Sequence, residues 1–215
     1  MIDGKTMISL RIALAMAAAL LAAPAQAEEQ DVQLWGFLTA IVPVDDGATA
    51  TFELSPRLRA GTEQLQSRAG VDFAVTPLVD LGGGVIWVEF DRGHEFRTYQ
   101  QAELSLGRVH LRTRVEERFL AGADRAQLRV RPHVQYSQPL APGLRGSTSI
   151  EMLYVVRSEV PGQPDRTDSW RFNVAAAYRV SPHIELGAGY LAVYRPRPGA
   201  PDRLSHAPQL RLTVR

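Results

Sequence analysis

The feature that most constrains the fold is a regular alternation of apolar and polar residues along most of the chain. In the segment 108–119, Val109, Leu111 and Val115 fall on one face, whereas arginines and glutamates fall on the other. Successive side chains point to opposite sides in a β-strand, so a period of two predicts strands. Strand-like segments of this kind occupy residues 32–42, 48–60, 63–75, 81–91, 96–106, 108–119, 126–138, 144–157, 169–180, 183–194 and 206–214.

These segments are about ten residues long, which is the length that a tilted membrane-spanning strand needs. Their connections alternate between short turns at 76–78, 107, 139–143 and 181–182 and longer polar loops at 91–96, 120–125, 157–168 and 195–205. Short turns on one side and long loops on the other are typical of outer-membrane barrels. The pattern therefore predicts an all-β fold, a transmembrane antiparallel up-and-down β-barrel. We expect its long loops at the cell surface and its N-terminus on the periplasmic side.

Aromatic residues and the number of strands refine this prediction. Aromatic side chains gather near the strand ends, as in the girdles of such barrels, at Phe90, Phe96, Phe119, Tyr136, Tyr154, Trp170, Tyr178 and Tyr194. The segments suggest about ten to twelve strands, and the eleven that we find conflict with the even number normal for a bacterial single-chain barrel. We therefore expect either ten or twelve strands.

The N-terminal segment has the three parts of a secretory signal peptide. Basic residues precede a short apolar run, and Ala25-Gln26-Ala27 supplies a small-residue cleavage site. The run is too short for the roughly 20 residues of a membrane helix. We predict a signal peptide over 1–27, cleaved after Ala27, and a barrel domain over 28–215. Met7 is an alternative start, because the signal is complete without the residues before it.

Charge balance and cysteine content restrict the partners. After residue 27, basic and acidic residues are equal in number, and every basic residue is an arginine. Without a basic excess, nucleic acid is not an expected partner. The absence of cysteine excludes a disulfide scaffold and a thiolate metal site. The expected partners are outer-membrane lipid, the barrel-insertion machinery and small solutes, and no cofactor is expected.

The polar faces of neighbouring strands place arginines opposite carboxylates. When each hairpin is folded at its turn, five pairs face each other: Arg68 with Glu89, Glu103 with Arg112, Glu116 with Arg129, Arg131 with Glu151, and Arg179 with Glu185. Inside a narrow barrel, such pairing offsets the cost of removing a guanidinium from water. We predict that these residues and Arg114 line the lumen. The same alternation also fits a soluble periplasmic β-sandwich or a lipocalin-like binding protein with its apolar face inward.

Several short motifs resemble a known family. They are Asp31-Val32-Gln33-Leu34-Trp35, Arg57-Leu58-Arg59, Arg68-Ala69-Gly70-Val71 and Gly82-Gly83-Gly84. With the signal peptide, they resemble the uncharacterised bacterial outer-membrane proteins grouped as domain of unknown function 2490 (DUF2490). The resemblance covers residues 31–215 and implies an outer-membrane barrel, but the family supplies no catalytic residues. The chain departs from such barrels at its end, where an arginine stands in place of the usual aromatic residue.

Neither catalysis nor metal binding is expected. Ser205 and His206 are adjacent, so in a strand they point to opposite faces and cannot act together as nucleophile and base. His110 and His133 share the inner face of one hairpin, but a metal site needs more ligands at short spacing. We predict that the chain is not an enzyme, and a lipid-modifying barrel enzyme is the alternative.

The arginine-rich segments leave two functions open. The arginine excess in 108–118 and 129–131 favours anions if water passes through the barrel. If no water passes, the same arginines form an ion-pair network that plugs a structural barrel. We therefore expect either a narrow passive channel for small solutes, anions among them, or a structural barrel. The residues expected to decide between these functions are Arg112, Arg114, Arg129 and Arg131, with Glu116 and Glu151 as partners.

Overall fold

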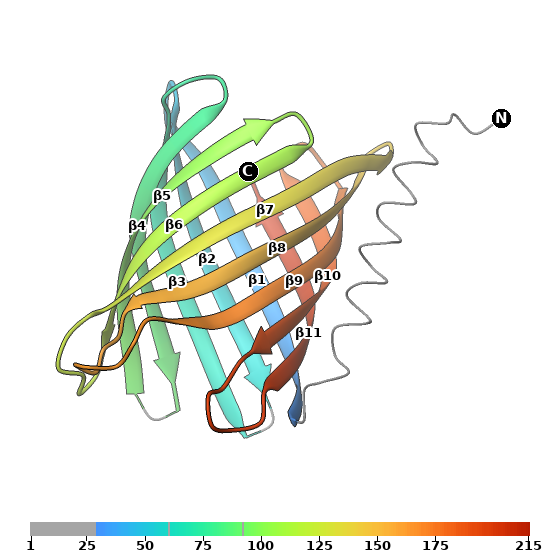
Figure 1. The fold of residues 1–215 in the computed structure, drawn as a ribbon. Coiled ribbons are helices and arrows are strands. Elements are labelled where there is room, and N and C mark those ends of the chain that lie inside the picture. Colours follow the sequence, from blue (N-terminus) through green and yellow to red (C-terminus); the bar gives the residue numbers. More distant parts are fainter. Residues whose placement is uncertain (1–28, 60, 92) are drawn as a thin grey trace.

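The computed structural model describes residues 29–59, 61–91 and 93–215, and these form a closed barrel (Figure 1). Within these ranges, no helix is long and apolar enough to cross a membrane. The described residues form eleven strands: β1 (Glu29–Asp45), β2 (Ala48–Arg59), β3 (Thr62–Ala74), β4 (Val79–Phe90), β5 (Gly93–Leu106), β6 (Val109–Leu120), β7 (Gln127–Ala141), β8 (Leu144–Arg157), β9 (Arg166–Arg179), β10 (Ile184–Arg195) and β11 (Arg203–Val214). Each predicted segment corresponds to one of these strands. The predicted signal peptide and its cleavage after Ala27 lie outside the described residues.

The barrel closes through a parallel pair of strands. Consecutive strands are antiparallel, but β1 pairs with β11 in parallel from Glu29 opposite Arg203 to Ala40 opposite Val214. In an up-and-down chain with an odd number of strands, the first and last strands run in the same direction, so the closing pair must be parallel. The expectation of ten or twelve strands is therefore wrong for the described barrel, because an even number is required only when the closing pair is antiparallel.

The parallel closure places the start of β1 and the end of β11 at opposite ends of the barrel. The backbone N–H of Glu29 donates to the carbonyl of Asp202, in the loop before β11. At the other end, the N–H of Arg215 donates to the carbonyl of His183, in a short turn. The first strand thus begins at the end that carries the long loops. The expectation that these loops and the N-terminal end of the barrel lie on opposite sides of the membrane is wrong.

The connections show the predicted asymmetry with one exception. Longer loops at 121–126, 158–165 and 196–202 lie at one end, which we call the loop end, and tight turns lie at the other, the turn end (Figure 1). The predicted loop at 91–96 is instead the start of β5, which begins at Gly93. This polar segment joins the ladder because its side chains pack across strands. The His94 ring stacks on Trp87 at 4.6 Å between centroids, and Phe96 lies 5.9 Å from Phe119.

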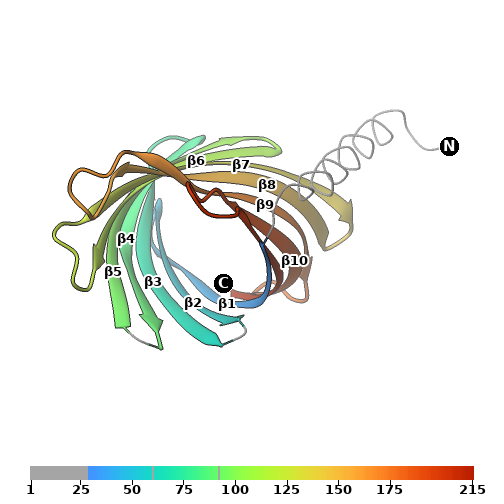
Figure 2. The same cartoon turned by 60° about the horizontal axis from the view of Figure 1, so that its bottom comes forward.

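The apolar faces of the strands point outward and the polar faces point inward. Leu54, Leu186 and Leu210 are each more than two-fifths exposed on the outside, whereas Glu116 and Glu151 are buried inside. Figure 2, seen from a direction tilted toward the barrel axis, shows the strands in a ring around the lumen. This is the arrangement of a transmembrane barrel, and it is the reverse of a soluble sandwich or lipocalin. The soluble alternative is therefore not the observed fold.

The glycine-rich segment of β4 makes room for an inward aromatic residue. Gly70, Gly84 and Tyr99 are register neighbours on β3, β4 and β5. A Cβ atom on Gly70 would lie 2.1 Å from the Tyr99 hydroxyl, and one on Gly84 would lie 2.8 Å from it. Tyr99 therefore crosses both glycines, and Phe90 packs with it in an inward apolar cluster. The prediction that Phe90 belongs to an outward aromatic girdle is wrong.

Candidate lumen site

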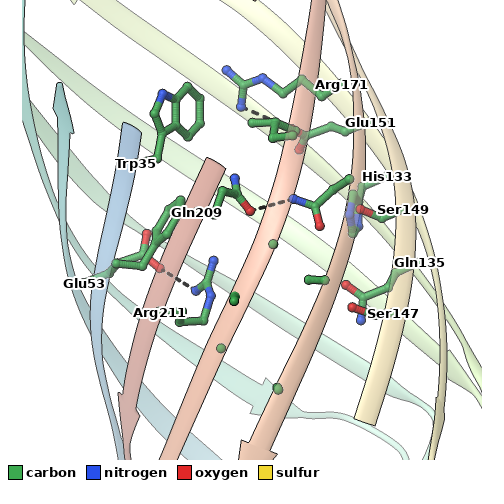
Figure 3. A pocket seen from close by; sticks show the side chains of 18 of the residues that line it. Trp35, Glu53, His133, Gln135, Ser147, Ser149, Glu151, Arg171, Gln209 and Arg211 are labelled. Carbon is green, nitrogen blue, oxygen red and sulfur yellow. Dashed lines mark hydrogen bonds and ion pairs between the residues drawn. The ribbon is translucent and has the colours of Figure 1, made fainter. Parts of the chain in front are cut away.

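The lumen contains a cavity of about 410 Å³, which we call the vestibule. Figure 3 shows polar side chains from several strands pointing into it, with Arg171 and Glu151 near Trp35, and Arg211 near Glu53. Arginine predominates among its charged lining residues, which are Arg57, Arg68, Arg97, Arg112, Arg114, Arg131, Arg145, Arg171 and Arg211 against Glu53, Glu151 and Glu185. The vestibule is therefore a strongly cationic space.

Small residues create the space of the vestibule. The inward positions of β9 and β10 include Ala175, Ala177, Gly187 and Gly189, all of which line the cavity. These residues project almost no side chain into the lumen, so this part of the wall is hollow. The lining arginines project from eight strands, β2, β3, β5, β6, β7, β8, β9 and β11. A solute in the vestibule would thus lie against a wall of small residues and face guanidinium groups.

The vestibule is open toward the turn end and ends before the loop end. Its lining includes Arg145 and Glu185, which lie close to the tight turns. Toward the loop end, the inward side chains of Val88, Leu153 and Val155 are completely buried. Complete burial of these inward side chains on β4 and β8 shows that other side chains cover them on the lumen side. We call this filled part the closed half, and it also contains the buried carboxylate of Glu95.

An ion-pair network lies beside the vestibule. The Glu151 carboxylate accepts hydrogen bonds from Arg112 at 2.7 Å, Arg131 at 2.8 Å and Arg171 at 3.4 Å. Arg131 also donates to Glu116. One carboxylate thus serves three guanidinium groups, and Arg131 links the two acids. Because the carboxylates are shared in this way, pairing reduces the positive charge without removing it.

The second acid, Glu116, collects further cations. Arg129 donates to it at 2.6 Å, and Arg114 lies 3.8 Å away. Arg114 donates instead to the amide oxygen of Gln101 at 2.6 Å and stacks on Tyr99 at 4.2 Å from the ring centroid. The six residues that were expected to decide the function are therefore all inward, and they form one connected cluster on β6, β7 and β8.

The five predicted cross-strand pairs have different outcomes. Glu116 is opposite Arg129 in the register and bonded to it. Arg131 bonds to Glu151, although the residue opposite Glu151 in the register is His133. Glu103 is opposite Arg112, but it accepts a hydrogen bond from Gln101 at 3.1 Å, whereas Arg112 donates to Glu151.

The other two pairs differ more. Glu185 is opposite Arg179, yet its ion pairs are with Arg145 at 3.3 Å and Arg215 at 3.5 Å, and Arg179 is exposed. Glu89 is on the outward face, opposite Leu65, and so it cannot line the lumen.

The partner of Arg68 lies on the preceding strand instead. Its guanidinium is 3.4 Å from the carboxylate of Glu53, which also lies 3.4 Å from Arg211. The prediction of an Arg68–Glu89 pair failed because Ile86, not Glu89, is opposite Arg68 in the register. A register error of an odd number of residues places a side chain on the other face of the barrel.

Sequence reasoning missed the cluster around Trp35. Trp35 faces the lumen from β1, and the Arg57 guanidinium lies over its ring at 3.9 Å from the centroid, with Arg171 at 5.7 Å. Arg57 and Glu53 follow the period of two along β2, so this pattern alone could have placed both on one face. Their neighbours on β1, β9 and β11 are too distant in sequence for such a pattern to reveal.

The histidines singled out in the sequence lie in different surroundings in the described barrel. His133 lines the vestibule, whereas His110 is exposed and contacts the Ser105 hydroxyl at 3.1 Å. Ser205 donates to Asp31, and His206 contacts Tyr190 on the outer face. No group of three or more His, Cys, Asp or Glu side chains in the described part of the chain is placed to hold a metal ion.

These features define a transmembrane β-barrel whose lumen is cationic in the vestibule and filled by side chains toward the loop end. The sequence pattern of the family described as "Protein of unknown function (DUF2490)" matches residues 32–204, so the chain belongs to this family. A comparison with curated proteins finds no match.

Two solved structures are similar to this chain. A NanC porin aligns with a TM-score of 0.53 and 10% sequence identity, over 79% of this chain and 89% of the porin. A bacterial polysaccharide outer membrane secretin aligns with a TM-score of 0.47 and 10% identity, over 77% of this chain and 63% of the secretin. At this identity, the likeness to the porin shows the fold alone. The fold is thus that of a porin-like barrel.

Proposed function

We propose that the chain is exported through its signal peptide, inserts into the outer membrane with the help of the barrel-insertion machinery, and acts as a narrow passive channel for small anionic solutes. The observation that carries this proposal is the lining of the vestibule, where nine arginines face three glutamates. A charged, low-dielectric passage concentrates ions of the opposite charge. Solutes enter from the turn end, and the closed half is the barrier that they must pass.

The barrel's size supports a narrow passage. About eight strands are just filled by side chains, whereas porins with sixteen or more strands hold a wide aqueous channel. A described ring of eleven strands lies near the lower limit, so the volume of individual side chains decides whether space remains. The small residues of β9 and β10 supply that space in the vestibule.

Recordings in planar lipid bilayers test this function. With a potassium chloride gradient across the bilayer, the reversal potential of the wild-type channel is expected to indicate preference for chloride over potassium. Arg211→Gln and Arg145→Gln each remove a cation from the vestibule, so both are expected to shift the reversal potential toward zero. Arg157→Gln removes the same charge at the loop end, outside the vestibule, and serves as the matched control.

Two results would contradict the proposal. A protein that is folded and inserted but never conducts would be a structural barrel, whose closed half is permanent. A channel that prefers cations would show that the arginines do not control passage. Recovery of the full-length protein in the outer membrane fraction, with an unboiled band that runs faster on a gel, establishes insertion independently of conduction.

A further inference from the structure

The inner end of the vestibule holds more hydrogen-bond donors than acceptors. Arg57 has no carboxylate within ion-pair distance among the described residues, and one of its terminal nitrogens donates to the amide oxygen of Gln66 at 3.1 Å. The Nε atom of Arg57 is buried and lacks a hydrogen-bond partner. The same holds for the Nε atoms of four other lining arginines, Arg68, Arg112, Arg131 and Arg171. A buried N–H group without an acceptor is costly, so five such groups around one cavity favour a bound acceptor.

The charge at this position has the same imbalance. Arg112, Arg131 and Arg171 share the single carboxylate of Glu151, and Arg57 approaches the Trp35 ring that Arg171 also approaches. Trp35 lies 6% exposed beneath these cations, and its indole N–H donates to Gln33, so the ring is fixed. The aromatic face stabilises the guanidinium groups without neutralising them. The net positive charge is therefore left for a mobile anion.

We propose that Arg57 and Arg171, seated on Trp35, form a binding site for a small tetrahedral oxyanion of the phosphate class. This inference rests on the proposed function, because the site lies on the path of the solute. A dianion with four oxygens accepts from several guanidinium groups at once, and arginine forks match phosphate geometry. Chloride carries a negative charge but is a single acceptor atom, whereas the separate N–H groups of several arginines need several acceptor atoms.

The cavity also accommodates more than the anion alone. Its volume of about 410 Å³ is within the range of small-molecule sites. Between the inner end and the turn end, it is lined by groups that bond hydroxyls, including Ser147, Ser149 and the hydrogen-bonded pair Asn173 and Gln209. Inorganic phosphate and a small phosphate ester therefore share the proposed site, and the ester adds contacts with these polar groups.

The three tryptophans permit a direct test of binding. Trp87 and Trp170 lie on outward positions of β4 and β9, so replacing both by phenylalanine leaves Trp35 as the single reporter. The full chain, folded in detergent, is titrated with inorganic phosphate and separately with glycerol phosphate at constant ionic strength maintained by chloride. We expect a saturable change in Trp35 fluorescence with each phosphate compound and none when chloride alone is varied.

Variants separate the site from general charge effects. Arg57→Gln is expected to weaken phosphate binding by about tenfold or more, since it removes a charge-assisted hydrogen-bond donor. Arg179→Gln removes an exposed charge near the turn end outside the vestibule and is expected to leave the affinity unchanged. Because Arg57 contacts the reporter itself, titration calorimetry with the original tryptophans measures the same affinities independently.

Several outcomes would overturn the inference. Absence of saturable phosphate binding in both measurements does so, as does an equal response to chloride or an unchanged affinity in Arg57→Gln. Tighter binding of glycerol phosphate than inorganic phosphate identifies an ester as the better ligand of the same site. These results are independent of bilayer conduction, so a barrel that binds phosphate but does not conduct contradicts the channel alone.

Discussion

The vestibule and the closed half are two parts of one lumen, built by the same strands with the same alternation of residues. In the vestibule, alanine and glycine occupy inward positions of β9 and β10, and arginines outnumber acids. In the closed half, Leu153, Val155 and Val88 fill the space. The difference teaches that the strand number sets the diameter of the ring, whereas side-chain volume and charge balance decide which part of the lumen is open.

The pairing of charges differs in the same way. In the closed half, Glu95 accepts from Arg97 at 2.6 Å and from Arg118 at 2.5 Å, and Arg118 also donates to Gln127. Two cations surround one acid, and Gln127, which accepts from Arg118, continues the network to Glu159 in a loop. In the vestibule, by contrast, the Nε atoms of five lining arginines lack any partner among the described residues. The closed half therefore contains a structural ion-pair network, whereas the vestibule has donors available to bind a ligand.

The largest effect is expected where the closed half loses its central acid. Glu95→Gln leaves the buried Arg97 and Arg118 without their carboxylate, and breaking a buried ion pair in this way costs about 3 kcal/mol or more. Urea titration of the protein folded in detergent measures the free energy of unfolding. Glu89→Gln, an exposed glutamate near the same end, is the matched control, with an expected change of about 0.5 kcal/mol or less. Equal losses in the two variants would show that Glu95 is not a structural anchor.

The second prediction concerns the volume of side chains that fill the closed half. Leu153→Ala deletes a completely buried inward side chain and should cost about 2 kcal/mol of stability. It should also raise the single-channel conductance, since the barrier loses material. Leu38→Ala makes the same change on the lipid-facing surface, where Leu38 is exposed, and should leave the conductance unchanged. A Leu153→Ala channel with wild-type conductance would place the barrier elsewhere.

The smallest effect concerns the loop before β11. A hydrogen bond from the Tyr194 hydroxyl, at 2.5 Å, and one from the backbone N–H of Arg197 lower the pKa of Asp202 below its ordinary value. A lowered carboxyl pKa stabilises the fold above the ordinary pKa, and this stabilisation is lost as the pH falls through the lowered value. Wild type and Asp202→Asn should therefore differ in unfolding temperature near neutral pH, and the difference should shrink progressively as the pH falls below about 4. A difference that persists on acidification would assign it to another group.

The sequence predicted the local features of the barrel and missed those that depend on distant strands. The period of two located every described strand, because the alternation is a property of one segment. It could not reveal the parallel pairing of β1 with β11, since this depends on how the two ends of the chain meet. The number of strands was therefore misjudged, although the eleven segments themselves were found.

The candidate site shows the same limit. The hairpin neighbours Glu116 and Arg129 were predicted as a pair, since their strands are consecutive. The approach of Arg211 to Glu53 crosses the closing strands of the barrel, and no local pattern encodes it. The vestibule itself was not predicted, because its space results from small residues on β9 and β10 that matter only when larger side chains surround them.

Accessibility of the two parts of the lumen tests the account most directly. The chain contains no cysteine, so a single introduced thiol is the only target for a small, anionic, membrane-impermeant thiol reagent. Ser147 lines the vestibule on β8, and Ser169 is completely buried on the inward face of the adjacent β9. The account predicts rapid labelling of the Ser147→Cys variant and little labelling of the Ser169→Cys variant in the folded barrel. Equal rates for the two variants would contradict the division of the lumen into an open and a closed part.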